Sequence, residues 1–127
     1  MLLSKIITFD AAHSLPFHEG QCKQLHGHTW KAIITIDCVV NKNMMGLDFR
    51  EFSNVLKEHV VSKLDHHYLN EFITLPTAEN LSIWIWKALQ GFLPMHSVQL
   101  FESETSFVTL DKESFYEYGM RGEHSWV

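Results

Sequence analysis

Hydrophobic and polar positions alternate along the first part of the chain in the way that is typical of β-strands. From Leu3 to His13 the apolar side chains recur at every second residue, and the face that they form ends at His13. A second run, residues 29–36, is rich in β-branched residues, which favour strands. Together the two runs predict an antiparallel hairpin around the polar loop 16–24.

The pattern then changes to that of helices. Turn-forming residues fill 41–46, and Asp48 with Glu51 has the spacing of a capping box. Apolar residues recur at helical spacing as far as Leu64, and a second helical pattern runs from an N-cap at Thr77 to the stop signals at Gly91 and Pro94. Two short strands are predicted after it, at 98–102 and 107–110.

The predicted order is therefore strand, strand, helix, helix, strand, strand. This order is typical of an α+β fold in which one four-stranded antiparallel sheet carries two helices on one face. Residues 111–127 follow no clear period, so we expect a loosely packed C-terminal extension. With 127 residues, 46% of them hydrophobic, the chain suits a single domain over 1–127 with a substantial core.

Charge and cysteine content narrow the class of partner. The formal net charge is −5 and Lys and Arg form no run, which argues against nucleic acid. No apolar run is long enough to span a bilayer and the N-terminus lacks the pattern of a signal peptide, so we expect no membrane association and a cytoplasmic protein that binds a small molecule. Cys38 shares a face with Ile34 and Ile36 and is predicted to be a buried core residue. No disulfide with Cys22, in the polar loop, is expected.

Three histidines are the first candidate for chemistry. His26 and His28 open the second strand two residues apart, so they point to the same face, and the hairpin brings His13 opposite them. Three neutral imidazoles are the ligand set of an open catalytic Zn²⁺ site, where water or substrate takes the fourth position. The same pattern also fits hydrogen-bonded core histidines, and Cys22 could instead complete a closed structural site.

Two further groups have the chemistry of an active site. Asp65 and His66 end the first predicted helix, where the carboxylate can orient the ring for proton transfer, although the pair also fits a solvated helix end. Glu102 ends the apolar row of Val98 and Leu100. It either emerges into solvent or binds the N–H groups of a cationic or amidine-like ligand.

Five short motifs, which include all of these residues, occur in order along the chain. They are Phe9-x-Ala-Ala-His13, Cys22-x-x-x-His26-Gly27-His28, Leu64-Asp65-His66-His67-Tyr68-Leu69-Asn70, Pro76-Thr77-x-Glu79-Asn80 and Val98-x-Leu100-x-Glu102-Ser103. Together they resemble the motifs of the 6-pyruvoyltetrahydropterin synthase and 6-carboxytetrahydropterin synthase family. The match extends to about Leu110.

The resemblance implies the tunnelling fold and a defined assembly. In such an assembly the sheets of three subunits close a β-barrel, and two trimers stack into a homo-hexamer. The active site then lies at a subunit interface. Association of this kind explains how a short chain protects its sheet edges.

The three-residue spacer between Cys22 and His26 resembles the 6-carboxytetrahydropterin synthase branch, which serves queuosine and deazapurine biosynthesis. The implied reaction takes 7,8-dihydroneopterin triphosphate to 6-carboxy-5,6,7,8-tetrahydropterin, with release of acetaldehyde and triphosphate. Two alternatives stay open. One is a pyruvoyl-type synthase, which eliminates triphosphate and keeps the side chain; the other is a non-catalytic, zinc-stabilised binding module.

The resemblance also implies a role for each candidate residue. Zn²⁺ would be held by His13, His26 and His28, with Cys22 as the base. His66, oriented by Asp65, would move the second proton, and Glu102 would anchor the pterin and take part in the charge relay. Thr77 and Glu79, in the fourth motif, are candidate substrate-binding residues.

Overall fold

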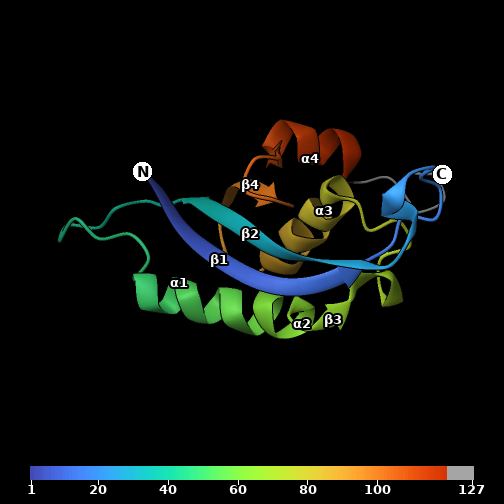
Figure 1. Ribbon diagram of the computed structural model, residues 1–127. Coiled ribbons are helices and arrows are strands. Elements are labelled where there is room, and N and C mark those ends of the chain that lie inside the picture. Colours follow the sequence, from blue (N-terminus) through green and yellow to red (C-terminus); the bar gives the residue numbers. More distant parts are fainter. Residues whose placement is uncertain (120–127) are drawn as a thin grey trace.

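The computed structural model describes residues 1–119, and a long curved hairpin is its central feature (Figure 1). The hairpin consists of β1 (Leu2–His13) and β2 (His26–Asp37), joined by a loop that contains the short 3₁₀ helix η1 (Gln21–Lys23). β4 (Met95–Phe101) and β5 (Phe107–Asp111) extend the sheet beyond β2, and β3 (His67–Tyr68) lies on the other side of β1. The strand order is β3-β1-β2-β4-β5.

The predicted hairpin is confirmed, and its register follows from the alternating pattern. Phe9 pairs with Trp30, Ala11 with His28, and His13 with His26. Phe9, Ala11 and Trp30 of this face are buried, because the apolar row on each strand packs against the same core, and His26 and His28 at its end are partly buried. His13 and His26 end this face next to the loop that connects the two strands.

The two predicted helical regions are present and cover the buried face of the sheet. α1 (Phe49–Leu56) continues through the π-helical segment η2 (Lys57–Val61) into α2 (Ser62–Leu64), and it begins where Asp48 accepts a hydrogen bond from the Arg50 N–H. α3 (Ala78–Leu89) begins where the Thr77 side chain accepts from the Asn80 N–H, as the N-cap prediction requires. In Figure 1, α1 and α2 lie along the hairpin and α3 crosses behind it.

The sheet has five strands rather than the predicted four, and it is mixed rather than purely antiparallel, because β3 runs parallel to β1. The physical reason is the end of the helix at Asp65, where the backbone becomes extended. The Asp65 carboxylate accepts a hydrogen bond from the Asp10 N–H at 2.9 Å, and the His66 N–H donates to the Asp10 carbonyl at 2.6 Å. These two bonds lay the next residues along β1, and η3 (Leu69–Glu71) follows them.

The prediction of a loosely packed extension is wrong for residues 111–119. Asp111 accepts a hydrogen bond from the Ser114 N–H at 2.8 Å and so begins a third helical region, α4 (Lys112–Tyr118). Phe115 of α4 is buried and its ring stacks on Trp86 of α3, with 4.9 Å between centroids. The remaining residues of the predicted extension, 120–127, lie outside the described residues.

The cysteines are both free, in agreement with the absence of a predicted disulfide. Cys38 is only partly buried against the core, whereas the alternation predicted full burial, because β2 ends at Asp37 and the chain leaves the sheet there. Within the described part of the chain, residues 1–119, none of the helices has the length and apolar character that crossing a bilayer requires.

Replacing Phe115 with Ala tests whether α4 is part of the core. The side chain is 4% exposed, and truncating a buried Phe removes apolar contact and leaves a cavity, so the free energy of unfolding should fall by about 3 kcal/mol. Urea denaturation followed by tryptophan fluorescence measures the change. The matched control is Tyr116→Ala, whose side chain is 71% exposed and whose loss should cost less than about 0.5 kcal/mol. Equal losses for the two variants would mean that α4 is not docked.

Candidate metal centre and active site

His13, His26 and His28 converge at the end of the hairpin where the connecting loop begins. One ring nitrogen from each lies within 4.8 Å of those of the other two. The ring centroids are 4.5 Å apart for His13 and His26, 5.0 Å for His13 and His28, and 4.8 Å for His26 and His28. The structure therefore brings together the three imidazoles that the sequence pattern selected.

The protein backbone fixes the orientation of two of these rings. The Nδ1 atom of His13 lies 2.7 Å from the Pro76 carbonyl oxygen, and the Nδ1 atom of His26 lies 2.7 Å from the Gln24 carbonyl oxygen. A carbonyl oxygen only accepts, so each Nδ1 carries the proton and donates it. The Nε2 lone pair of both rings is thereby left available, which is the arrangement that metal-binding histidines use.

Two of the Nε2 atoms are buried without a hydrogen-bond partner, those of His13 and His28. Glu102 Oε1 lies 3.5 Å from His28 Nε2, which is within ion-pair reach of a protonated ring but does not make a hydrogen bond. Desolvation by burial lowers the pKa of His13, and it lowers the pKa of His28 against the opposing effect of the Glu102 carboxylate. Both rings are therefore held neutral, with lone pairs that a Zn²⁺ ion would satisfy.

Trp30 forms an apolar wall beside the three rings. Its indole ring is fully buried and meets His13 and His28 edge-on, at centroid distances of 5.2 Å and 5.4 Å. Its Nε1–H donates to the Ala11 carbonyl at 3.3 Å, so its position is fixed. A wall of this kind excludes water from one side of the centre and strengthens the electrostatic effect of a bound cation.

Cys22 lies in η1, in the loop that connects β1 and β2. It is not part of the group formed by the three histidines. Its thiol is partly buried and free. Among residues 1–119 the group contains three histidines and no fourth His, Cys, Asp or Glu. The arrangement thus favours an open metal site over the closed site that Cys22 would complete.

Asp65 and His66 form the predicted pair. His66 Nδ1 lies 2.9 Å from Asp65 Oδ2, and His66 has a positive φ of 60°, which is uncommon for a residue with a side chain. The pKa of the Asp65 carboxyl is lowered, first by the hydrogen bond from the Asp10 N–H and then by His66. The carboxylate is therefore ionised and orients the imidazole.

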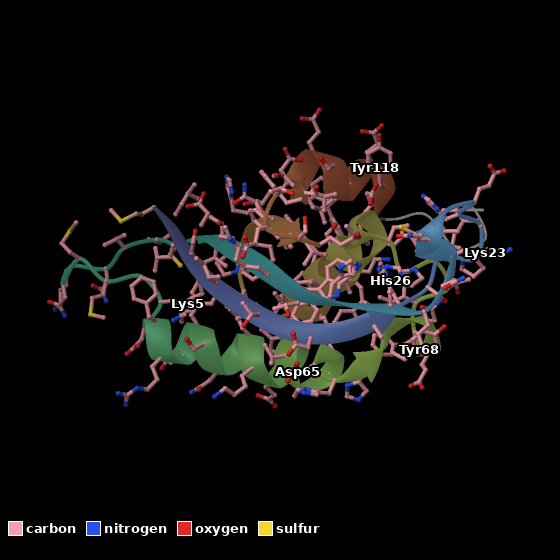
Figure 2. The ribbon with its side chains drawn as sticks, in the orientation of Figure 1. Lys5, Lys23, His26, Asp65, Tyr68 and Tyr118 are labelled. Carbon is pink, nitrogen blue, oxygen red and sulfur yellow. The ribbon has the colours of Figure 1, made fainter. Side chains whose placement is uncertain are left out.

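The pair and the three histidines lie on opposite faces of the sheet. His13 belongs to the buried face of β1, and Asp10, three residues earlier, belongs to the other face, since successive side chains alternate. The Asp10 carboxylate lies within 4.8 Å of Asp65 and His66. In Figure 2, Asp65 lies beyond the edge of β1 that faces away from β2 and His26. Within one chain, β1 separates the two groups.

Thr77 and Glu79 lie in a different place, on the wall of a cavity of about 770 Å³ between α3, β5 and α4. Thr77 also caps α3, so its hydroxyl has a structural function. The preceding residue, Pro76, is the one whose carbonyl holds His13, so the cavity and the metal centre share a segment of chain. The three histidines and Glu102 are not part of the cavity wall.

The family model for 6-pyruvoyl tetrahydropterin synthase matches residues 2–113 of the chain. The chain belongs to this family. A 6-carboxy-5,6,7,8-tetrahydropterin synthase from Synechocystis sp. is 36% identical over 118 residues, which cover 83% of the chain and 88% of the relative. A dihydroneopterin monophosphate aldolase from Pyrococcus furiosus is 34% identical over 87 residues, which cover 68% of the chain and 73% of the relative.

A solved structure agrees with this assignment at the level of the fold. The 6-pyruvoyl tetrahydropterin synthase of Caenorhabditis elegans superposes with a TM-score of 0.78 over 87% of the chain and 94% of that protein, at 20% sequence identity. The α+β fold with a five-stranded sheet is thus the fold of this family of pterin synthases.

The sequence analysis did not identify three polar groups that orient the candidate site residues or lie beside them. The carbonyl oxygens of Gln24 and Pro76 orient the rings, but a backbone acceptor leaves no mark in a pattern of side chains. Asp10 was only an unspecified position within the first motif. A lone carboxylate inside an otherwise strand-forming run, where Asp is disfavoured, is the signal that could have identified it.

The zinc-free protein should lose stability as the pH falls below the ordinary histidine pKa of 6.5. Burial lowers the pKa of His13 and His28 in the folded state, so the unfolded state binds more protons there. The free energy of unfolding should therefore rise as the pH is raised towards 6.5 and level off above it. Urea denaturation of the chelator-treated protein between about pH 5 and about pH 8 measures this dependence.

The variant His13→Gln should show a flatter pH dependence, because one of the two titrating groups is gone. His18→Gln is the matched control, since His18 lies on the exposed loop and its loss should leave the slope unchanged. An unchanged slope in His13→Gln would contradict the assignment of a buried, neutral ring.

Proposed function

We propose that the protein is a zinc-dependent 6-carboxy-5,6,7,8-tetrahydropterin synthase of queuosine biosynthesis, acting in the cytoplasm. It converts 7,8-dihydroneopterin triphosphate and one water molecule to 6-carboxytetrahydropterin, acetaldehyde and triphosphate. The observation that carries the proposal is the convergence of three imidazoles, two of which have a buried, unpaired Nε2 atom. The likeness to the Synechocystis enzyme, which bears this name, supports the choice of reaction.

His13, His26 and His28 are the proposed zinc ligands. When bound, Zn²⁺ supplies a Lewis acid that acidifies the C–H and O–H protons of the substrate side chain. The chain's own contribution is to hold the three lone pairs in place. Backbone carbonyls fix the rings of His13 and His26, and Trp30 keeps water from one side.

Cys22 and His66 are the proposed proton-transfer residues. Cys22 acts as the base, because it is the thiol nearest in sequence to the zinc ligands and lies outside the ligand group. His66 moves the second proton. Its Nδ1 faces Asp65 at 2.9 Å, so its Nε2 is the atom that exchanges the proton with the substrate.

Glu102 is the proposed anchor for the pterin. It lies next to His28 at the end of β4, and a carboxylate there gives two acceptor oxygens for the N–H groups of an aminopyrimidine edge. It also takes part in the charge relay. Thr77 and Glu79 are proposed to contribute further substrate contacts.

In this proposal, the site is completed by a neighbouring subunit in a homo-hexamer made of two trimers. Since β1 separates the zinc ligands from Asp65 and His66, the proton-transfer pair of one subunit serves the zinc centre of its neighbour. Closure of three sheets into a barrel, and stacking of two barrels into a hexamer, would bring the two faces of neighbouring subunits together.

Product analysis tests the reaction. Incubation of the zinc-loaded protein with 7,8-dihydroneopterin triphosphate should release acetaldehyde in equal amount to 6-carboxytetrahydropterin, measured by hydrazine trapping and mass spectrometry. Cys22→Ala should keep its zinc and lose about a hundred-fold or more in turnover, because the base is removed and the metal ligands are not. Triphosphate release without acetaldehyde would indicate the pyruvoyl-type reaction. Zinc loss in Cys22→Ala would favour a closed structural site.

Mixed oligomers test whether the site is shared between subunits. Cys22→Ala and His66→Ala should each retain only a small residual turnover when assembled alone. If Cys22 and His66 act from different chains, an equal mixture assembled together should recover about a quarter of wild-type turnover, since half of the subunits supply each intact residue at random. Separately assembled variants mixed afterwards are the control. No recovery in the mixed oligomers would mean that both residues act from one chain.

A further inference from the structure

Asp10 adjoins the Asp65–His66 pair, although neither the motif comparison nor the proposed mechanism assigns it a function. It lies in β1 on the face opposite His13. Its carboxylate, the Asp65 carboxylate and a ring nitrogen of His66 lie within 4.8 Å of one another. The Thr29 hydroxyl donates to Asp10 Oδ1 at 2.6 Å across the hairpin, so the Asp10 side chain is held in this orientation.

The two carboxylates of this cluster repel each other least when the imidazole beside them is protonated. Two carboxylates at this separation repel each other, and like charges are avoided on one sheet face unless a cation lies between or beside them. His66 is the one member of the cluster that can become a cation. The arrangement of Asp10 and Asp65 is therefore complementary to a protonated His66.

The backbone of Asp10 holds the same pair. Its N–H donates to the Asp65 carboxylate at 2.9 Å, and its carbonyl accepts from the His66 N–H at 2.6 Å. These bonds support the left-handed backbone of His66, which a non-glycine residue adopts only when its surroundings enforce it. Asp10 thus binds the pair through its backbone N–H and carbonyl, and its negatively charged carboxylate lies close to both side chains of the pair.

We propose that Asp10 is a positioning residue, which stabilises the imidazolium form of His66 while that ring holds the transferred proton. The inference rests on the proposed role of His66 in proton transfer. When His66 accepts the proton, a substrate O–H or C–H bond breaks, an N–H bond forms at Nε2, and a positive charge appears on the ring. Asp65 lies directly beside that charge and Asp10 completes its environment. When the proton is passed on, the N–H bond breaks and the charge disappears.

Asp10→Asn is the decisive variant, because it removes the charge while keeping an oxygen for the Thr29 hydroxyl and both backbone hydrogen bonds. In the zinc-loaded oligomer, kcat should fall about ten-fold or more, while KM, zinc content and oligomer size stay unchanged. Asp10→Glu, which keeps the charge, should recover part of the lost kcat. Asp37→Asn is the matched control. It removes the same charge from the other end of the hairpin and should leave kcat unchanged.

A double variant separates action through His66 from a general structural effect. If Asp10 acts through His66, Asp10→Asn should cause no further loss in a His66→Ala background. An equal loss in both backgrounds, or an unchanged kcat in Asp10→Asn, would overturn the inference. Should Asp10→Asn fail to assemble, Thr29→Val decides instead. It leaves every charge in place but frees the Asp10 carboxylate, and unchanged turnover in that variant would count against the inference.

The same series distinguishes failure of the inference from failure of the proposed function. If His66→Ala retains wild-type turnover, the proposed role of His66 is wrong and the inference falls with it. If His66→Ala is impaired while Asp10→Asn is not, only the role of Asp10 is wrong.

Discussion

The pairing of β1 with β2 in a single register is the constraint on which the candidate site depends. A slip of one residue would turn every side chain of one strand to the other face of the sheet. His13 would then lose its place opposite His26, and the Phe9 row would leave the core. The burial of Phe9 and Trp30 opposite each other opposes such a slip. The same apolar contacts that stabilise the hairpin therefore fix the geometry of the three imidazoles.

β1 contributes a residue to the three-histidine group and another to the Asp65–His66 group. The alternation of its side chains places these two residues on opposite faces of the sheet. His13 lies on the buried face of β1, and Asp10, with its contacts to Asp65 and His66, lies on the other. Their separation is set by the backbone and does not depend on side-chain rotation. The Ser14 backbone N–H and carbonyl also bind the side-chain amide of Asn70, so the segment that follows His66 is attached to β1 at a second point. A subunit built in this way holds the two groups of side chains in a fixed relative orientation.

The sequence predicted what depends on regular periods and missed what depends on short or irregular contacts. The convergence of three histidines follows from a period of two and one hairpin, and the covering helices follow from helical spacing. β3 has two residues, too few to show a period. It exists because Asp65 binds the backbone of β1 and Asn70 binds the backbone of Ser14, directly after β1. α4 has seven residues, and its one buried anchor, Phe115, stands among exposed aromatic residues that conceal the pattern. The side of the sheet on which His66 lies depends on the path of the chain after the helix, which no local pattern encodes.

The contrast in exposure between the two groups matches the chemistry that each would perform. Metal ligands must stay neutral, and burial achieves this for His13, which has no exposed surface and whose pKa is lowered by desolvation. A proton-transfer residue must instead become charged and discharged, and burial in an apolar core would oppose that change. The His66 side chain is 79% exposed and lies beside the Asp10 and Asp65 carboxylates. An exposed imidazole acts on a substrate only where another surface covers the substrate, so the openness of His66 is itself an argument for a site closed by a second subunit.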